Sequence, residues 1–330
     1  MEPLFSGQPF TTTDALAAGV SRRELARLRS TGVLRPVLFG VYVDARSPDD
    51  PSTRAAALAR VLPAGAVVCR RSAAWLYGVD GLEPGREHDL PQLDAAVPVG
   101  HSPVRRAGVH GVVEPLTETD VAVVGGIPVT TPLRTAVDLA RWLPRRSAMA
   151  CVDALLHHGL VGLDELITGV ERFAGHRYVE QARNLIGLAE PKTESFGESW
   201  LRLRLIDSGF PALEAQIEVR EPDGLPFARI DLGERRLRKG IEYDGEQAHC
   251  GAAERAHDTA RRARLARDFG WEVVGVDKAA VLGRGPGLES LAAELLGVSP
   301  QPRCIPKEPP APDGWAGAAD TGAWRADRGR

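Results

Sequence analysis

Apolar and polar residues alternate in two neighbouring stretches toward the C-terminal end, and this alternation predicts two β-strands. The stretches are FARIDLG, which contains Asp231, and GIEYDGE, which contains Glu242 and Asp244. The polar run GERRLR between them predicts the turn of an antiparallel hairpin, which would place Asp231 roughly opposite Glu242. Asp244 lies two residues after Glu242 and therefore shares its face of the sheet.

The patterns around this hairpin predict an α/β domain over residues 191–297. ESFGESWLRLRLIDSG reads as an amphipathic helix, LEAQIEVR as a strand, AAERAHDTARRARLARDFG as a second helix and WEVVGVD as a last strand. The order helix, three-stranded meander, helix, strand is typical of a mixed sheet flanked by helices. The fold class that we expect is therefore α/β, in several domains.

The N-terminal 43 residues predict a winged helix-turn-helix. TTTDALAAG offers Thr12 or Thr13 as the N-cap of a short helix. Ser21 would cap a second helix, SRRELARLRSTG, with Glu24 at the reciprocal capping-box position. VLRPVLFGVYV then predicts a β-hairpin with Gly40 near its turn. In a winged helix the second helix enters the major groove of DNA.

Basic residues gather on the exposed side of this second helix. They are Arg22, Arg23, Arg27 and Arg29, and Arg35 follows on the wing. Charged residues are also usual on a solvated helix face. A solvated face without DNA contact is therefore the alternative interpretation. We expect Arg22, Arg23, Arg27 and Arg35 to contact DNA.

The rest of the chain divides by composition. We expect a polar linker at 44–52, a mixed α/β region at 53–190 that extends the N-terminal unit, and a disordered tail rich in Pro, Gly and Ala at 298–330. Within the middle region, Pro132 after Thr131 predicts the first position of a helix.

Bulk properties narrow the class of protein. The chain has 330 residues, a formal net charge of -3 and 43% apolar residues, which is ordinary for a globular protein and excludes a uniformly basic nucleic-acid coat. We find neither an apolar run long enough to span a membrane nor a secretion signal. The four cysteines are scattered, without zinc-finger spacing, and we interpret them as reduced thiols in a cytoplasmic protein.

The three carboxylates suggest metal chemistry. Like charges on one sheet face repel each other unless a cation holds them, and magnesium is held by one or two carboxylates together with phosphate oxygens. Asp231, Glu242 and Asp244 therefore predict metal-assisted cleavage of a phosphodiester. The alternative interpretation is a solvated hairpin face whose charges point to water.

Two family resemblances cover most of the chain. From TTTDALAAGVSRRELARLRSTGVLRPVLFGVYV through SAAWLYGV to IPVTTPLRTAVDLAR it resembles the abortive-infection type IV antitoxins, winged-helix regulators widespread in actinobacteria. From GESWLRLRLIDSG through RIDLGE and IEYDGEQAH to RLARDFGWEVVGV it resembles the domain related to very-short-patch-repair endonucleases, of the PD-(D/E)xK, restriction-endonuclease-like superfamily.

The second resemblance implies roles for individual residues. Asp231 would be the central ligand of Mg²⁺ or Mn²⁺, Glu242 the second acidic ligand, and Glu198 the helix carboxylate that completes or orients the metal shell. Asp244 lies where the superfamily usually has a lysine, so the general base is unassigned.

The same resemblance leaves two residues that could handle the attacking water. His249 could act as the base, and Gln216 could position the water. Arg261 and Arg262, together with Arg264, would hold the flanking phosphates.

Three functions remain open at this point. The first is a DNA-binding, magnesium-dependent endonuclease, and the second is an antitoxin-like transcriptional regulator with an inactive nuclease-like domain. The third is an interaction protein that binds neither metal nor DNA. The partners that we expect are DNA and a toxin or other protein, with a possible homodimer because cutting both strands needs two active sites.

Overall fold

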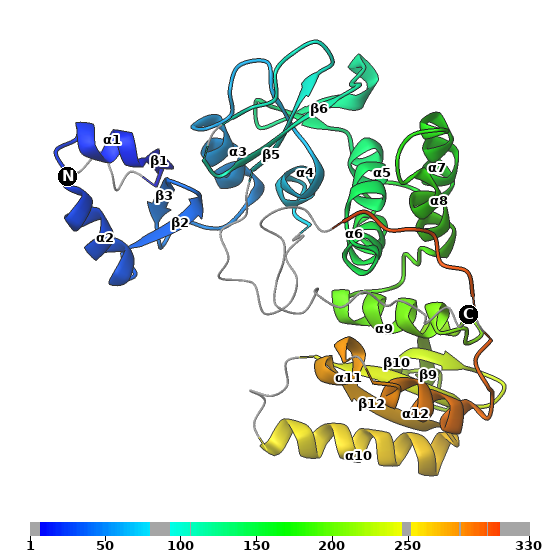
Figure 1. Ribbon diagram of the computed structural model, residues 1–330. Helices are drawn as coiled ribbons and strands as arrows, with labels where there is room; N and C mark the ends of the chain where they lie inside the picture. Colours follow the sequence, from blue (N-terminus) through cyan, green and yellow to red (C-terminus); the bar gives the residue numbers. More distant parts are fainter. Residues whose placement is uncertain are drawn as a thin grey trace. The chain divides into compact units, whose positions relative to one another are not determined.

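The structure is a computed structural model that describes residues 7–79, 93–105, 107–245, 252–283, 285–301 and 303–310. The chain forms two compact units, Met1–Leu139 and Ala140–Arg330. Three separate sheets and the helices around them confirm the predicted α/β class with several domains (Figure 1). In the part of the chain that the structure describes, no helix combines the length and the apolar character that crossing a membrane requires.

The first unit begins with the predicted helices and wing. Its elements are β1 (Phe10–Thr11), α1 (Thr12–Ala17), α2 (Arg22–Ser30), β2 (Leu34–Leu38) and β3 (Val41–Asp44). The antiparallel hairpin β2–β3 forms the wing, and β1 adds to it in the order β1-β3-β2. The helix, turn, helix and wing that the sequence predicts are therefore confirmed.

The N-cap of α1 lies one residue before Thr12, the earlier of its two predicted caps. Thr11, rather than Thr12 or Thr13, is the N-cap, because its Oγ1 accepts from the Asp14 N–H at 3.1 Å. The Asp14 carboxylate accepts in return from the Thr11 N–H at 2.7 Å, which closes a capping box. Three consecutive threonines are equally good caps by residue type, and the hydrogen bond to the Asp14 carboxylate selects Thr11 among them.

Helix α2 confirms Ser21 as its cap and corrects the role of Glu24. The Ser21 Oγ accepts from the Glu24 N–H at 3.1 Å. The Glu24 carboxylate binds the Arg27 guanidinium at 2.9 and 2.6 Å. An exposed arginine one turn away thus competes successfully with the backbone N–H of the cap. Leu25 and Leu28 are buried, as their spacing predicts.

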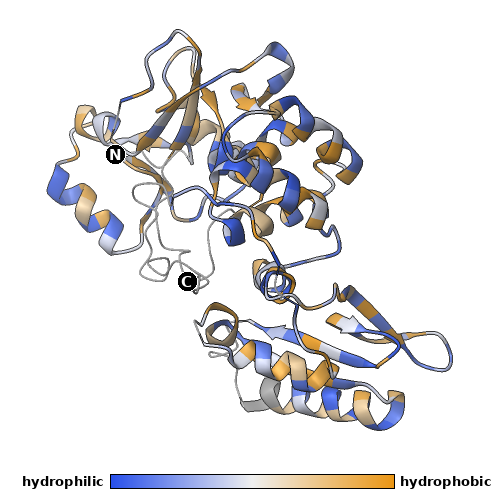
Figure 2. Ribbon diagram, turned by 45° about the vertical axis from the view of Figure 1, so that its right-hand side comes forward, coloured by the Kyte–Doolittle hydropathy of each residue, from blue (hydrophilic) through white to orange (hydrophobic). Residues whose placement is uncertain are grey.

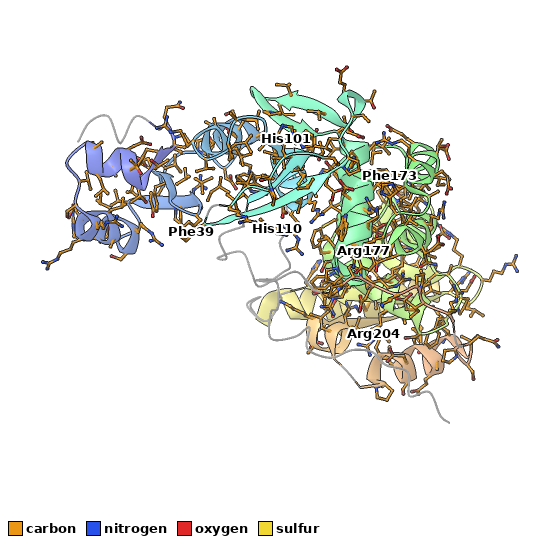
Figure 3. All side chains as sticks on the ribbon, turned by 45° about the horizontal axis from the view of Figure 1, so that its top comes forward. Phe39, His101, His110, Phe173, Arg177 and Arg204 are labelled. Carbon is orange, nitrogen blue, oxygen red and sulfur yellow. The ribbon has the colours of Figure 1, made fainter. Side chains whose placement is uncertain are left out.

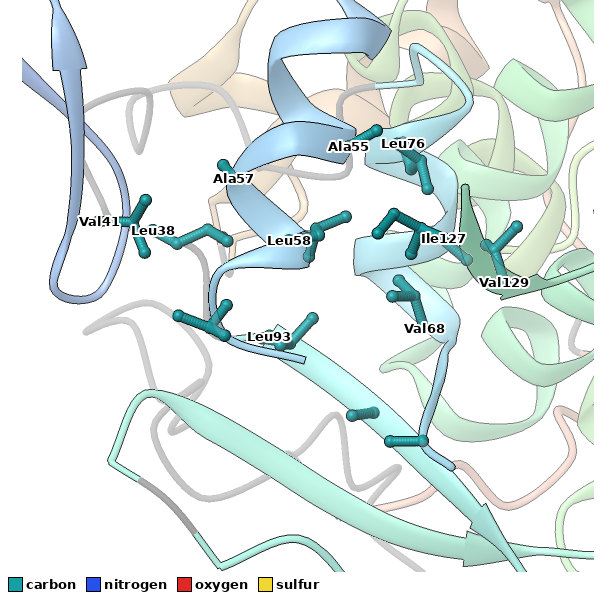
Figure 4. Packing of buried hydrophobic residues seen from close by; sticks show 14 of the residues in the cluster. Leu38, Val41, Ala55, Ala57, Leu58, Val68, Leu76, Leu93, Ile127 and Val129 are labelled. Atoms are coloured by element: carbon teal, nitrogen blue, oxygen red, sulfur yellow. The ribbon is translucent and has the colours of Figure 1, made fainter. Parts of the chain in front are cut away.

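The wing lies between two apolar cores of the first unit. Leu34 and Tyr42 pack in the core of the helix-turn-helix. Leu38 and Val41 belong to the core that Leu58 of the following helix shares (Figure 4). Because the hairpin is buried on both faces, it is fixed to the rest of the unit and does not project freely.

The remainder of the first unit is a five-stranded mixed sheet with helices. Its elements are α3 (Pro51–Ala59), β4 (Val67–Val68), α4 (Arg70–Leu76), β5 (Leu93–Pro98), β6 (Val109–Glu114), a 3₁₀ turn (Glu118–Asp120), β7 (Val121–Val124) and β8 (Ile127–Thr130), with the strand order β6-β5-β4-β8-β7. Helix α5 (Pro132–Trp142) begins at Pro132, as predicted. Asp50 caps α3 by accepting from the Thr53 N–H at 2.8 Å, so the polar connection after the wing ends in an ordered helix start.

The second unit begins with helices that support the C-terminal domain. They are α6 (Arg145–His157), α7 (Leu163–Gly169), a 3₁₀ segment (Val170–Phe173), α8 (Val179–Leu188) and α9 (Phe196–Asp207). Buried Asp153 of α6 accepts from Ser199 Oγ at 2.8 Å and from Arg202 Nη2 at 3.0 Å, both on α9. Burial raises the pKa of Asp153, which these α9 donors oppose. A buried, hydrogen-bonded ion pair thus joins α9 to the helical layer.

The C-terminal domain has the predicted mixed sheet. Its elements are β9 (Glu214–Arg220), β10 (Pro226–Glu234), β11 (Lys239–Asp244), α10 (Ala252–Phe269), β12 (Glu272–Asp277), α11 (Lys278–Leu282) and α12 (Gly287–Leu296). The strand order is β12-β11-β10-β9, with β12 parallel to β11 and the other pairs antiparallel. Hydrophilic and hydrophobic residues alternate along the long helix α10 (Figure 2). The sheet lies between α9 and α10 (Figure 1).

Part of the predicted disordered tail is ordered along the second unit. The Gln301 N–H donates to the Gly209 carbonyl at 2.9 Å, and the Glu308 carboxylate accepts from the Arg145 N–H at 3.1 Å. These bonds satisfy the ends of α9 and α6, a tertiary role that composition alone does not reveal. Residues 311–330 lie outside the described residues.

Candidate nucleic-acid interface and acidic centre

The arginines of α2 divide into available and engaged side chains. Arg22 and Arg23 are exposed in the first turn and have no ion-pair partner among the described residues. Arg27 is bound to Glu24, and the Arg29 guanidinium lies 5.5 Å from the ring centroid of Tyr42. The end of α2 that carries positive dipole charge therefore also carries the two available guanidinium groups.

Arg35 on the wing points toward the connection that follows it. Its Nη2 donates to the Ser47 carbonyl at 3.3 Å, and its Nη1 lies 4.0 Å from Asp49. Arg35 is only half-buried, so it keeps solvent access while stabilising the segment before α3. Its contact with DNA remains a prediction.

The tip of the wing carries an aromatic residue that the sequence reading did not single out. Phe39, labelled in Figure 3, is 59% exposed, although it lies against Gly108 in the loop before β6. A Cβ at position 108 would overlap the Phe39 side chain, and Gly108 has a φ of +78°. A large apolar residue next to Gly40 at a predicted turn is the sequence pattern that could have singled out Phe39.

The hairpin β10–β11 has the register that the sequence predicts. Leu232 pairs with Ile241, so the next position along places Asp231 across from Glu242. The Asp231 Oδ2 accepts from the Tyr243 N–H at 2.8 Å. This bond fixes the Asp231 carboxylate against the β11 backbone.

Strands β9 and β10 exchange their faces at Gln216 and Asp231. Ala215 and Leu232 belong to the core on the α9 side, whereas Ile217 and Ile230 belong to the core that contains Leu265 of α10. Residues two apart on a regular strand share a face. Gln216 has a φ of +55°, and this left-handed backbone breaks the alternation. The local twist brings both polar side chains to the border between the two cores.

Glu198 in the first turn of α9 reaches the same border. Its Oε2 accepts from Gln216 Nε2 at 2.6 Å and its Oε1 from Ser195 Oγ at 2.7 Å. The preceding residue, Gly197, permits this approach because a Cβ there would overlap the ring of Tyr243. The structure thus brings Glu198 and Gln216 into direct contact, and the charge of Glu198 acts on Asp231. Their shared role in holding a metal stays a prediction.

Asp231 has the most perturbed carboxyl group of this centre. Burial raises its pKa to about 7, and the negative charges of Glu198 and Glu242 act in the same direction. The Tyr243 N–H and the more distant Arg261 oppose this rise. Asp231 therefore lacks a counter-charge that would keep it ionised below neutral pH.

Glu242 and Asp244 do have counter-charges, which the two consecutive arginines of α10 provide. Arg261 donates to both oxygens of Glu242, at 2.9 and 2.7 Å. Arg262 donates from Nε to Glu242 at 2.9 Å and from both Nη groups to Asp244. The arginines expected to hold phosphates instead hold the carboxylates expected to hold a metal.

The centre therefore fits a divalent cation only incompletely. Asp231 and Glu198 converge, and the buried Oε1 of Gln216 has no hydrogen-bond partner among the described residues. However, the described residues contain no group of three or more His, Cys, Asp or Glu side chains that could hold a metal ion. Glu242 does not complete a metal site with Asp231 and Glu198, because its oxygens accept hydrogen bonds from guanidinium groups.

Of the remaining predicted residues, Arg264 does not join this centre. His249 lies outside the described residues. Arg264 of α10 binds Glu221 at 2.6 Å and lies over the ring of Phe227, with 4.2 Å between guanidinium carbon and centroid. Its partners, at the β9–β10 turn and the start of β10, therefore differ from those of Arg261 and Arg262.

The fold defines a class of protein: a winged-helix protein with an attached α/β sheet and a C-terminal α/β domain. Family models agree with the first two parts. Residues 1–43 match "Transcriptional regulator, AbiEi antitoxin", and residues 66–188 match "AbiEi antitoxin C-terminal domain".

Two curated relatives are similar to most of the chain. They are "Uncharacterized protein MT2308" and "Uncharacterized protein Rv2248" of two strains of Mycobacterium tuberculosis. Each is 32% identical over 259 residues, which cover 78% of this chain and 90% of the relative. The chain belongs to the AbiEi antitoxin family. Residues 191–297 lie outside both matched family segments, and their resemblance to repair endonucleases remains a prediction.

Proposed function

We propose that this protein is a DNA-binding transcriptional regulator of the antitoxin type, which docks on DNA through α2 and the wing. The observation that carries this proposal is the pair of available guanidinium groups, Arg22 and Arg23, at the start of an exposed helix. The family match of residues 1–43 to a transcriptional regulator supports it independently.

The local geometry suits recognition of a duplex. The N-terminal residues of a recognition helix contact base edges, and arginine forms bidentate bonds with guanine. Arg29 and Arg35 are held by Tyr42 and by the connection before α3, so they contribute positive charge at fixed positions. Because the wing is anchored on both faces, α2 would dock without a large ordering cost.

An affinity measurement tests this function. Duplexes enriched from a random pool by the wild-type chain would be titrated with wild type, Arg22→Ala/Arg23→Ala and Arg267→Ala. We expect the double variant to lose at least about tenfold in affinity at moderate salt. Arg267 binds Asp268 on α10 and serves as the matched control, which we expect to bind as wild type does. Equal affinity of all three proteins would refute docking through α2.

A protein partner is the second part of the proposal. The match of residues 66–188 to the AbiEi antitoxin C-terminal domain supports a toxin as this partner. Expression of the chain beside a candidate toxin gene would be expected to restore growth and to yield a co-purifying complex. Restored growth without a complex would indicate antagonism through DNA alone. A homodimer remains a prediction, which sedimentation of the purified chain would test.

The second candidate function is phosphodiester cleavage by the C-terminal domain with Mg²⁺ or Mn²⁺. The observation that favours it is the convergence of Asp231, Glu198 and Gln216 where two strands exchange faces. Glu242 would first have to leave its arginines. Plasmid nicking with magnesium, compared between wild type and Asp231→Ala, tests this function. Nicking that both proteins perform equally well would assign the cut to a contaminant or another site.

A further inference from the structure

Helix α10 places two consecutive arginines against two carboxylates of β11. Glu242 is only 4% exposed and accepts three guanidinium N–H groups, two from Arg261 and one from Arg262. Arg262 also binds the Asp244 carboxylate. Two positive and two negative side chains thus form a charge-balanced group with Glu242 at its buried centre, and Arg261 also lies 4.0 Å from Asp258 on the same helix.

The neighbouring strand leaves the space that this group needs. Gly275 of β12 pairs with Glu242 in the parallel register. A Cβ at position 275 would overlap both the Asp244 carboxylate and the Arg262 guanidinium. Residues from two adjacent strands and one helix therefore shape a site for the guanidinium group, rather than a chance surface contact.

The two arginines compensate the negative charges of Glu242 and Asp244, as a bound cation would. A hard divalent ion binds carboxylates whose charge is otherwise uncompensated. At Glu242, an incoming ion would meet two fixed positive charges at close range, where Coulomb repulsion is strong. Removal of one partner from a buried ion pair leaves an uncompensated charge, which opposes displacement of the arginines.

We propose that Arg261 and Arg262 are the resident counter-charge of this acidic centre, and that a divalent cation reaches Glu242 only when the arginine pair is displaced. Asp231 and Glu198 lie outside the pair and form a separate acidic pole with Gln216. The inference concerns the C-terminal domain alone and is independent of DNA binding by α2.

Calorimetric titration of the full chain with Mn²⁺ tests this inference. Wild type, Arg261→Gln/Arg262→Gln and the control Arg264→Gln would be compared at neutral pH. Arg264 lies on the same helix and binds Glu221 instead, so the control removes a positive charge outside the group. We expect the double variant to bind Mn²⁺ at least about tenfold more tightly than wild type and control. Equal affinities of wild type and double variant, including no binding by either, would overturn the proposal.

Two further variants locate the effect and protect against misfolding. Adding Glu242→Gln to the double variant should abolish the gained affinity, and a gain that persists would place the ion elsewhere and refute the proposal. If the double variant does not fold by circular dichroism, Arg262→Gln and Arg262→Lys replace it. Lysine keeps the charge but loses the planar fork, so it should gain less affinity than glutamine. Equal affinity of both with wild type would again refute the proposal. DNA binding of the same preparations reports separately on α2.

Discussion

Replacement of Asp231 by asparagine should stabilise the protein above neutral pH. The carboxylate is ionised there at the expense of burial and of repulsion by Glu198 and Glu242, and asparagine removes the charge. The amide oxygen can still accept from the Tyr243 N–H, which donates to Asp231 at 2.8 Å. The substitution thus keeps the local hydrogen bond while it removes the electrostatic penalty.

The expected size follows from the pKa of Asp231, which rises from 3.8 to about 7. At about 1.36 kcal/mol per pH unit, this rise corresponds to about 4 kcal/mol as an upper bound, and partial solvent exposure lowers the expected gain to about 2 kcal/mol. The folded state binds the proton more tightly than the unfolded state. The contribution of Asp231 to stability is therefore full below about pH 4 and is lost as the pH rises to about 7.

Urea unfolding of wild type and Asp231→Asn across this pH range measures the difference. The stability of wild type should fall relative to the variant between about pH 4 and pH 7 and then remain constant. The matched control is Asp223→Asn, which removes an exposed carboxylate in the turn between β9 and β10. A wild type that gains stability relative to Asp231→Asn as the pH rises would refute the assignment of Asp231 as a buried carboxyl without a counter-charge.

Three further substitutions test individual contacts by urea unfolding. Gly197→Ala should destabilise the C-terminal domain by about 1–3 kcal/mol, because a Cβ would overlap Tyr243; unchanged stability would contradict the close approach of α9 and β11. Asp153→Ala should cost about 3–5 kcal/mol, because it leaves buried Arg202 unpaired, and a cost below about 1 kcal/mol would show that water compensates the charge. Thr11→Ala should lower the free energy of unfolding by about 1 kcal/mol through loss of the α1 cap, whereas unchanged stability would show that Thr11 does not act as the cap.

Local signals predicted the elements and the hairpin register well. Ser21 as a cap, Pro132 as a helix start and the antiparallel register of β10 and β11 all depend on neighbours within a few residues or on strand alternation. Alternation also placed Glu242 and Asp244 on one face, which their shared partner Arg262 confirms. The sequence therefore contained most of the fold of the C-terminal domain.

The partners of the charged residues could not be predicted in the same way. Arg262 meets Glu242 because α10 folds back across the sheet and Gly275 leaves room, and both conditions are tertiary. The left-handed backbone of Gln216 has no local signal either, since glutamine rarely adopts it. The sequence thus identified the acidic residues but not the division of the centre into a paired and an unpaired part.

The salt dependence of DNA binding tests the central claim, docking through α2, most directly. The logarithm of affinity falls with the logarithm of salt concentration by about 0.9 for each phosphate contact. If Arg22 and Arg23 both contact phosphate, the slope of Arg22→Ala/Arg23→Ala should be shallower than that of wild type by about 2. If one of them contacts a base instead, the slope should change by about 1 and sequence preference should relax. A double variant with the slope and affinity of wild type would contradict the account.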